Sequence, residues 1–145
     1  MSWSGFLLGA IGAMFAWLAV EFVGRPFRRF FDLRGEVSRR LTQFGNVPAR
    51  GKLVGSEVEV IKLSPAQDAR LTEAENVYRD LASQMRGFAS AEWLAELIVR
   101  YVLRFNAHEI SKALIGLSNE IPTYGPRRDQ LKKDIQALLR IHALN

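Results

Sequence analysis

The chain has 145 residues, which is enough for one modest domain, and its 20 basic and 15 acidic side chains give a net charge of +5. It contains no cysteine, which excludes a disulfide framework, a thiolate nucleophile and any cysteine-ligated zinc or iron–sulfur site. The charge is unevenly spread: residues 1–20 carry none, whereas residues 25–52 hold eight basic and two acidic side chains, a net charge of +6. The rest of the chain therefore sums to −1.

Residues 3–23 form an apolar run that is interrupted only by Ser4 and Glu21. About 20 helical residues extend roughly 30 Å, the thickness of the hydrocarbon core of a bilayer. A chain this short has little core in which to bury such a helix on every side, so residues 1–24 are predicted to be a transmembrane anchor. The alternative is a cleaved signal peptide, which would start with a basic segment and end at an A-x-A site. The run has neither feature.

The charges that flank the apolar run predict its orientation. Six basic residues lie in the sixteen positions after the predicted anchor, residues 25–40, and none lies before the run. The positive-inside rule then places the N-terminus outside and the C-terminal ~120 residues in the cytoplasm. We therefore expect a single-pass protein of a bacterial inner membrane.

Small residues recur along one side of the predicted anchor. Such a stripe lets two helix backbones approach closely, and this packing drives association in lipid. The pattern predicts contact with a second copy or with another subunit, although glycine and alanine are also common in membrane helices generally. Glu21, at the cytoplasmic end, is expected to pair with Arg25 one turn on. The stripe consists of Gly5, Gly9, Gly12, Ala13 and Ala16.

Residues 25–44 predict a basic amphipathic helix next to the membrane. Aromatic side chains on one side and arginines on the other are typical of a helix in the headgroup region, where each arginine contributes about 1 kcal/mol on an anionic leaflet. Two alternatives are that the apolar side packs on the following domain, and that the segment binds nucleic acid. Topology already explains the charge, which disfavours nucleic acid. The residues expected at the lipid interface are Arg25, Arg28, Arg29, Arg34, Arg39 and Arg40, with Phe27, Phe30 and Phe31.

Residues 45–63 are predicted to be a loop or linker that separates this arm from the distal domain. Glycine, asparagine and proline cluster at its start. Residues 57–63 alternate polar and apolar side chains, which is typical of a short strand. One strand alone has no sheet to join unless it pairs with another chain, so an extended linker is the preferred interpretation.

Residues 64–145 are predicted to form a cytoplasmic helical domain of about four helices. The first begins at Ser64, which caps it in a capping box with Gln67. Ser90 is expected to cap the second, whose broad apolar face runs from Trp93 to Phe105, and Asn106 the third. A heptad seam on the first helix is predicted to pack inside the domain, and it consists of Leu71, Ala74, Tyr78, Leu81, Met85 and Phe88. The predicted fold class is thus an all-α membrane protein.

Motifs that carry chemistry are scarce in this sequence. His108 starts a zincin-like H-E-x-x-H pattern, but Lys112 stands where the second histidine is required. The sequence has no P-loop, no G-x-G-x-x-G and no G-x-S-x-G motif. We therefore expect no enzymatic activity, cofactor, metal site, small-molecule substrate or nucleic-acid partner.

A second basic cluster lies near the C-terminus. It is either a solvated helix face or a docking patch for an acidic partner, and it consists of Arg127, Arg128, Lys132 and Lys133.

The informative features of the sequence concern attachment and packing. They predict a membrane-tethered helical interaction module that serves as an accessory, assembly or scaffold subunit of a larger inner-membrane complex, with other subunits or a second copy as partners. The alternative is a self-oligomerising protein that binds anionic lipid and acts on the membrane itself.

Overall fold

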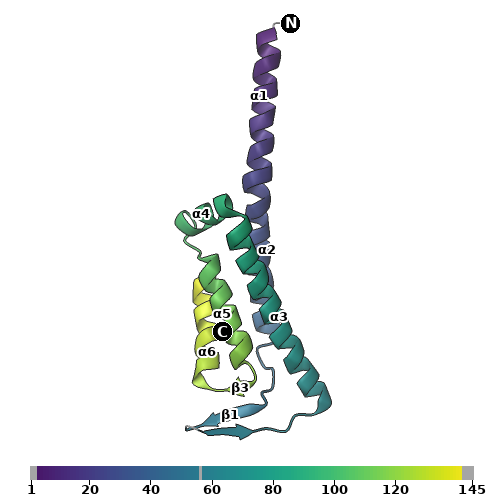
Figure 1. Cartoon of the computed structure of the whole chain (residues 1–145), viewed down its shortest axis with the longest axis vertical. Helices are drawn as coiled ribbons and strands as arrows, with labels where there is room; N and C mark the ends of the chain where they lie inside the picture. The colour runs from purple at the N-terminus through teal and green to yellow at the C-terminus, as the bar shows by residue number, and fades with distance from the viewer. Residues whose placement is uncertain (1–2, 56, 142–145) are drawn as a thin grey trace.

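The computed structural model describes residues 3–55 and 57–141, without the side chains of residues 4–6, and about three quarters of the described residues are helical. Figure 1 shows one long column, α1–η1–α2, whose α1 part projects from a folded domain formed by the remaining elements. In chain order the elements are α1 (Trp3–Ala19), the π-helix η1 (Val20–Gly24), α2 (Arg25–Gln43), β1 (Gly51–Val54), β2 (Glu57–Val60), α3 (Pro65–Ala91), α4 (Trp93–Tyr101), α5 (Ala107–Glu120), β3 (Thr123–Tyr124) and α6 (Pro126–Leu138).

The column is continuous because η1 joins α1 to α2 without a break. In η1 the N–H of Arg25 donates to the carbonyl of Val20, five residues back. Pro26 has no N–H to donate and its ring would clash with the carbonyl four residues earlier, and a widened π-turn accommodates both constraints. The predicted pair of Glu21 and Arg25 is confirmed, with a separation of 2.6 Å between Oε1 and Nη1.

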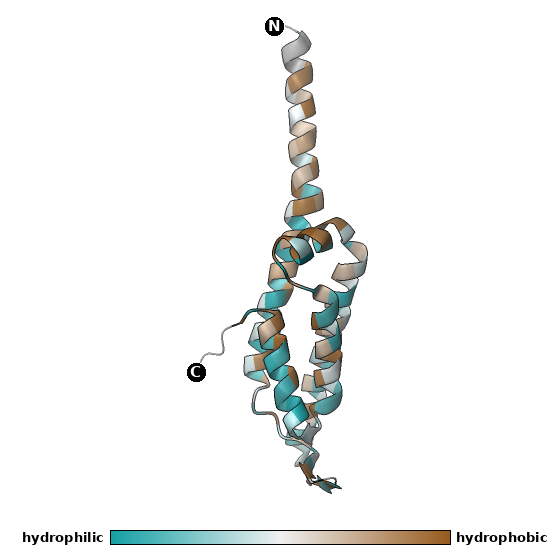
Figure 2. Cartoon of the chain, turned by 90° about the vertical axis from the view of Figure 1, so that its left-hand side faces the viewer, coloured by the Kyte–Doolittle hydropathy of each residue, from teal (hydrophilic) through white to brown (hydrophobic). Residues whose placement is uncertain are grey.

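The N-terminal part of this column is long and apolar enough to cross a membrane. It is the one such helix among the described residues, and its apolar window has no buried residue. Figure 2 colours most of this part brown or pale, in contrast to the teal residues that begin near the domain.

The apolar side of α2 lies in the core of the domain. Phe30 is fully buried, and its ring centroid lies 5.5 Å from that of Phe88 and 5.4 Å from that of Phe105. Leu33, Val37 and Leu41 continue this buried row along α2. The prediction that Phe30 meets lipid is therefore wrong, because an apolar stripe at helical spacing is the same whether lipid or protein covers it.

Helix α3 packs along α5. Helix α3 also contacts α2, and α5 also contacts α6. The predicted capping box is confirmed: the N–H of Gln67 donates to Oγ of Ser64 at 3.3 Å, and the N–H of Ser64 donates to Oε1 of Gln67 at 2.9 Å. Ser111 of α5 donates its hydroxyl to the carbonyl of Ala82 at 2.8 Å. All six seam residues are buried: Leu71, Ala74, Tyr78, Leu81, Met85 and Phe88.

A three-stranded sheet of order β2-β1-β3 replaces the linker expected at 45–63. β1 pairs antiparallel with β2, from Gly51 opposite Val60 to Val54 opposite Glu57, and parallel with the short β3. A Cβ at Gly51 would lie 2.7 Å from Cγ1 of Val58, so a larger residue there would force the Val58 side chain to shift. The fold is therefore mostly helical and not all-α. The partner of the expected strand is the adjacent β1, whose four residues show no clear alternation of polar and apolar side chains, and β3 joins β1 from about 70 residues away.

Helix α4 begins differently from its prediction. Ser90 does not cap it, because α3 continues to Ala91 and only Glu92 separates the two helices. Most of the predicted apolar face of this helix is exposed, and only Ala95 and Val99 of the helix are buried. Figure 2 shows α4 as a brown helix at the top of the domain.

Replacing the aromatic contact at the centre of the core tests how α2 is joined to the domain. Phe30→Ala is expected to lower the free energy of unfolding by about 3–5 kcal/mol, because it removes a fully buried ring and leaves a cavity. Denaturant unfolding of the detergent-solubilised protein, followed by near-ultraviolet circular dichroism, measures this loss. Its matched control is Phe31→Ala, since the adjacent ring is 43% exposed. Equal losses for the two variants would contradict the packing described.

Candidate functional site

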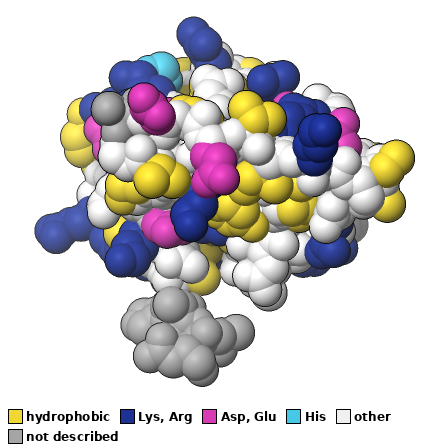
Figure 3. Space-filling model, turned by 90° about the horizontal axis from the view of Figure 1, so that it is seen from below, with side chains coloured by type: hydrophobic (Ala, Val, Ile, Leu, Met, Phe, Trp, Pro, Cys, Tyr) yellow, Lys and Arg dark blue, Asp and Glu magenta, His cyan; other side chains and the backbone are white. Residues whose placement is uncertain are grey.

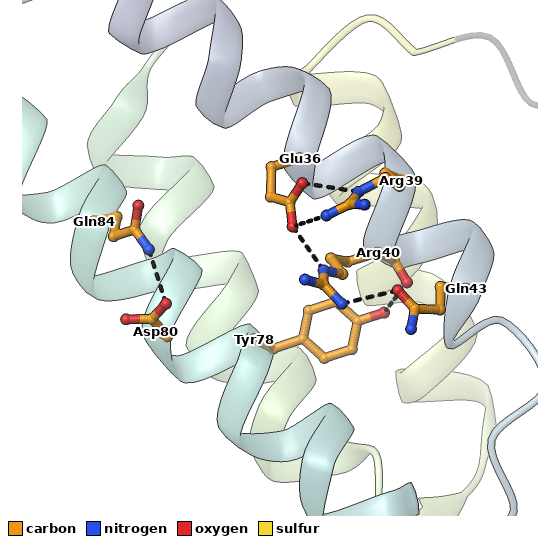
Figure 4. A network of polar contacts seen from close by, with 7 residues as sticks. All are labelled: Glu36, Arg39, Arg40, Gln43, Tyr78, Asp80 and Gln84. Carbon is orange, nitrogen blue, oxygen red and sulfur yellow. Dashed lines mark hydrogen bonds and ion pairs between the residues drawn. The ribbon is translucent and has the colours of Figure 1, made fainter.

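The predicted lipid-binding arginines are mostly engaged in contacts within the chain. Figure 4 shows Arg39 and Arg40 converging on the carboxylate of Glu36, with donor–acceptor distances of 2.7–2.9 Å. These hydrogen bonds, first from Arg39 and then from Arg40, hold the pKa of Glu36 at about 2. Arg40 also donates to Gln43 at 2.9 Å, and the Tyr78 hydroxyl donates to the carbonyl of Arg40 at 3.2 Å. Burial raises the pKa of the Tyr78 hydroxyl, so it acts here as a neutral donor.

Arg34 joins α2 to the end of α6. Its Nε donates to the carbonyl of Leu139 at 2.8 Å and its Nη2 donates to that of Arg140 at 3.3 Å. These carbonyls follow the last turn of α6, where helix carbonyls lack partners within the helix. Arg34 therefore stabilises the contact between α2 and the end of α6.

The remaining arginines of the arm cluster where η1 meets α2. Arg25 pairs with Glu21, and Arg29 lies 3.5 Å from the carboxylate of Glu92, the residue before α4. A shallow hollow lies between the two pairs, with Phe22 and Pro26 also in its lining. Arg28 is exposed, and no ion pair is found for it among the described residues. We call these residues, Glu21, Phe22, Arg25, Pro26, Arg28, Arg29 and Glu92, the junction.

Phe27 and Phe31 have different environments beside the junction. Phe27 is half-buried and packs against the core, whereas Phe31 is exposed. Of the three aromatic residues predicted at a lipid interface, Phe31 is thus the most accessible one.

The second basic cluster is not the surface patch that its sequence suggested. Arg128 is buried, and its guanidinium donates to the carbonyls of Ile121 at 3.0 Å and Val47 at 2.9 Å. Lys132 donates to the carbonyl of Gly45 at 2.9 Å. Burial lowers the pKa of both cations, and nearby Arg128 lowers that of Lys132 further. These two residues are unavailable to an acidic partner.

Arg127 and Lys133 are exposed, and Arg127 pairs with Glu120 at 3.2 Å. Sequence reasoning missed the structural role of Arg128 because an arginine among exposed charges carries no signal of burial. Its carbonyl partners lie in two other segments of the chain.

The small-residue stripe of α1 is open in the isolated chain. A Cβ added at Gly9 or Gly12 would meet no atom within 4 Å, and Ala13 and Ala16 are exposed. Gly5 is helical, but its surroundings lie outside the described side chains. Contact of the stripe with another helix stays a prediction.

Possible metal ligands do not cluster in the described part of the chain. No set of three or more histidine, aspartate or glutamate side chains there is placed to hold a metal ion. His108 is exposed in the first turn of α5.

Comparison of this chain with protein-family models, with curated proteins and with solved structures finds no match.

The buried guanidinium gives a prediction about stability. Arg128→Met is expected to lower the free energy of unfolding by roughly 2–4 kcal/mol, because the carbonyl of Ile121 loses the guanidinium as a donor and that of Val47 keeps only the 3.3 Å hydrogen bond from the Tyr124 hydroxyl. Arg127→Met is the control, and it should change that free energy by about 0.5 kcal/mol or less because its ion pair is exposed. Denaturant unfolding measures both variants, and a larger loss for Arg127→Met would refute the assignment.

The Glu36 cluster gives a prediction about pH. The pKa of Glu36 is lowered from 4.5 to about 2 in the folded chain, so its contribution to stability is fully present above pH 4.5 and is lost as the pH falls toward 2. The wild-type chain should therefore have a higher Tm than Glu36→Gln at neutral pH, and the difference should shrink below pH 4.5. Thermal unfolding at a series of pH values tests this, and a difference that grows on acidification would exclude the cluster as its source.

Proposed function

We propose that this protein is a membrane-anchored helical interaction module, an accessory or scaffold subunit of a larger complex in a bacterial inner membrane. In this proposal the apolar part of the column, up to Gly24, crosses the bilayer. The basic residues that follow lie on the cytoplasmic side, in accord with the positive-inside rule.

The continuity of the column is the observation that carries this proposal. A protein that only needs tethering to a membrane can use a flexible linker between anchor and domain. Here α2 follows α1 through η1 without a loop, and Phe30 and Val37 of α2 are fully buried in the domain core. The anchor and the domain therefore form one element. Any helix that contacts α1 in the bilayer is held in a defined relation to the cytoplasmic domain.

The geometry disfavours the alternative, in which six arginines bind anionic lipid. Arg39 lies 15 residues beyond Gly24, which is about 22 Å along a helix. This distance exceeds the Debye length of about 8 Å at physiological ionic strength. Attraction to headgroups is then confined to Arg25, Arg28 and Arg29, a modest charge for a protein that would act on the membrane by itself.

The opposite end of the domain offers a surface for contact in the cytoplasm. In Figure 1 the β1–β2 hairpin lies at the end of the molecule farthest from α1. Val54, Val58 and Val60 of the hairpin are exposed, and β2 is an edge strand. Figure 3 looks at this end and shows hydrophobic side chains gathered among basic and acidic ones. Exposed strand edges with apolar side chains are surfaces at which another chain can add a strand.

Recovery of the full-length, C-terminally tagged protein from membranes in mild detergent tests the proposal. We expect larger membrane proteins to co-purify with it in fixed stoichiometry. Gly9→Leu should reduce their recovery several-fold, because a side chain on the small-residue stripe prevents close helix approach. The substitution meets no atom within the chain, so folding should be unaffected.

Ile11→Leu is the matched control, since it keeps the volume of an exposed side chain on another side of the same helix. Recovery of a single species at a multiple of 16.4 kDa would favour the self-oligomerising alternative. Recovery of a monomer alone would contradict both.

A further inference from the structure

Helix α4 exposes an unusual amount of apolar surface for so short an element. Trp93, Tyr101 and the following Val102 are 67–71% exposed, and Leu94 and Leu97 are 39% exposed. Trp93, Leu97 and Tyr101 recur at intervals of four and therefore form one row along the helix. Burial of one such side chain is worth about 1.5–3 kcal/mol, so a row left in water forgoes a large stabilisation.

The helix is nevertheless firmly attached to the domain. Ala95 and Val99 are fully buried on its other side, and Phe105 follows in the core. Ala95 and Val99 therefore form the side of α4 that faces the core, and the exposed row lies on the opposite side of an attached helix.

The position of α4 indicates what covers the row. It contacts both η1 and α2, and Glu92 at its start lies 3.5 Å from Arg29 of the junction. In Figure 1 it lies at the top of the domain, across the direction of the column, at the level where α1 leaves the domain. A bilayer that α1 crosses would therefore have its surface beside α4.

The chemistry of the surface around the row fits the same environment. The neighbouring helix α2 carries three arginines of the junction, Arg25, Arg28 and Arg29. The guanidinium carbon of Arg100 lies 5.8 Å from the ring centroid of Tyr101. Tryptophan and tyrosine are enriched where a membrane meets water, since they combine an apolar body with a polar group. A short helix with aromatic residues on one side and basic residues nearby is typical of elements that lie in the plane of the headgroups.

We propose that α4 is a second membrane contact, which lies flat in the headgroup region of the leaflet from which the anchor emerges and inserts Trp93, Leu97, Tyr101 and Val102. This inference rests on the proposed anchoring by α1. Two attachments on one rigid domain fix its rotation as well as its distance from the bilayer, so the hairpin points away from the membrane.

The absence of native cysteine allows a direct test with single labels. Leu97→Cys and Val102→Cys, each carrying a polarity-sensitive fluorophore, are reconstituted as full chains in nanodiscs that hold one copy each. The nanodiscs contain phosphatidylcholine and phosphatidylglycerol, with or without a lipid that bears a nitroxide quencher either in its headgroup region or near the middle of an acyl chain. Met14→Cys, in the exposed part of α1, reports on the anchor, and Val60→Cys, which is 81% exposed on the distant hairpin, is the matched control.

We expect blue-shifted emission at positions 97 and 102 and quenching by the headgroup nitroxide that is several-fold greater there than at position 60. Position 14, about ten residues inside the span, should be quenched strongly by the acyl-chain nitroxide. If positions 97 and 102 behave like position 60 while position 14 is quenched, the anchor stands and the role of α4 is refuted. Blue-shifted but unquenched labels would mean that protein covers the row, which also overturns the inference. A label at position 14 that neither the headgroup nor the acyl-chain nitroxide quenches would refute the anchoring itself.

Discussion

A single continuous helical column is exposed in its first part and packed in the domain core in its last part, and the rest of the structure depends on this continuity. The column formed by α1, η1 and α2 is exposed and apolar in its first part and contributes Phe30, Val37 and Leu41 to the core in its last part. An α-helix transmits its direction along its length because every turn is hydrogen bonded to the next. The orientation of the domain therefore follows from the orientation of α1. The π-turn at η1 preserves this continuity at a proline that would otherwise break the hydrogen-bond ladder.

The basic residues of this chain stabilise the ends of helices as much as they charge its surface. Arg34 of α2 donates to carbonyls at the end of α6, and Arg128 and Lys132 of α6 donate to carbonyls just beyond the end of α2. The carbonyls at a helix C-terminus lack partners within the helix and carry partial negative charge, so cations suit them. The two helices thus satisfy each other's ends in a domain that has no disulfide. The high basicity of the sequence is partly a consequence of this packing.

The two exposed apolar regions of the domain lie at opposite ends and suit different environments. The row on α4 lies beside the junction and its arginines, where α1 leaves the domain. The valines of the hairpin lie at the far end, on an unpaired strand edge. In the proposed arrangement, a bilayer next to the first region leaves the second one free on the cytoplasmic side. This division fits the proposed module, which would hold a contact surface at a set distance from the membrane, with the small-residue stripe of α1 as a further proposed surface inside the bilayer.

Local signals in the sequence were sufficient for the helices, for the capping box of Ser64 and Gln67, and for the Glu21–Arg25 pair, because each depends on residues within one or two turns. The length of the apolar first helix could likewise be predicted from the sequence, since it depends on composition alone. Tertiary structure decided which medium covers each apolar stripe: Phe30, predicted to meet lipid, is buried, whereas Trp93 and Tyr101 of the apolar face on α4 are exposed. Tertiary structure also decided the addition of β3 to the sheet and the burial of Arg128, because β3 and the carbonyl of Val47 lie far from their partners in the chain. Helical periodicity records that a stripe is apolar, and only the packing of distant segments determines what it faces.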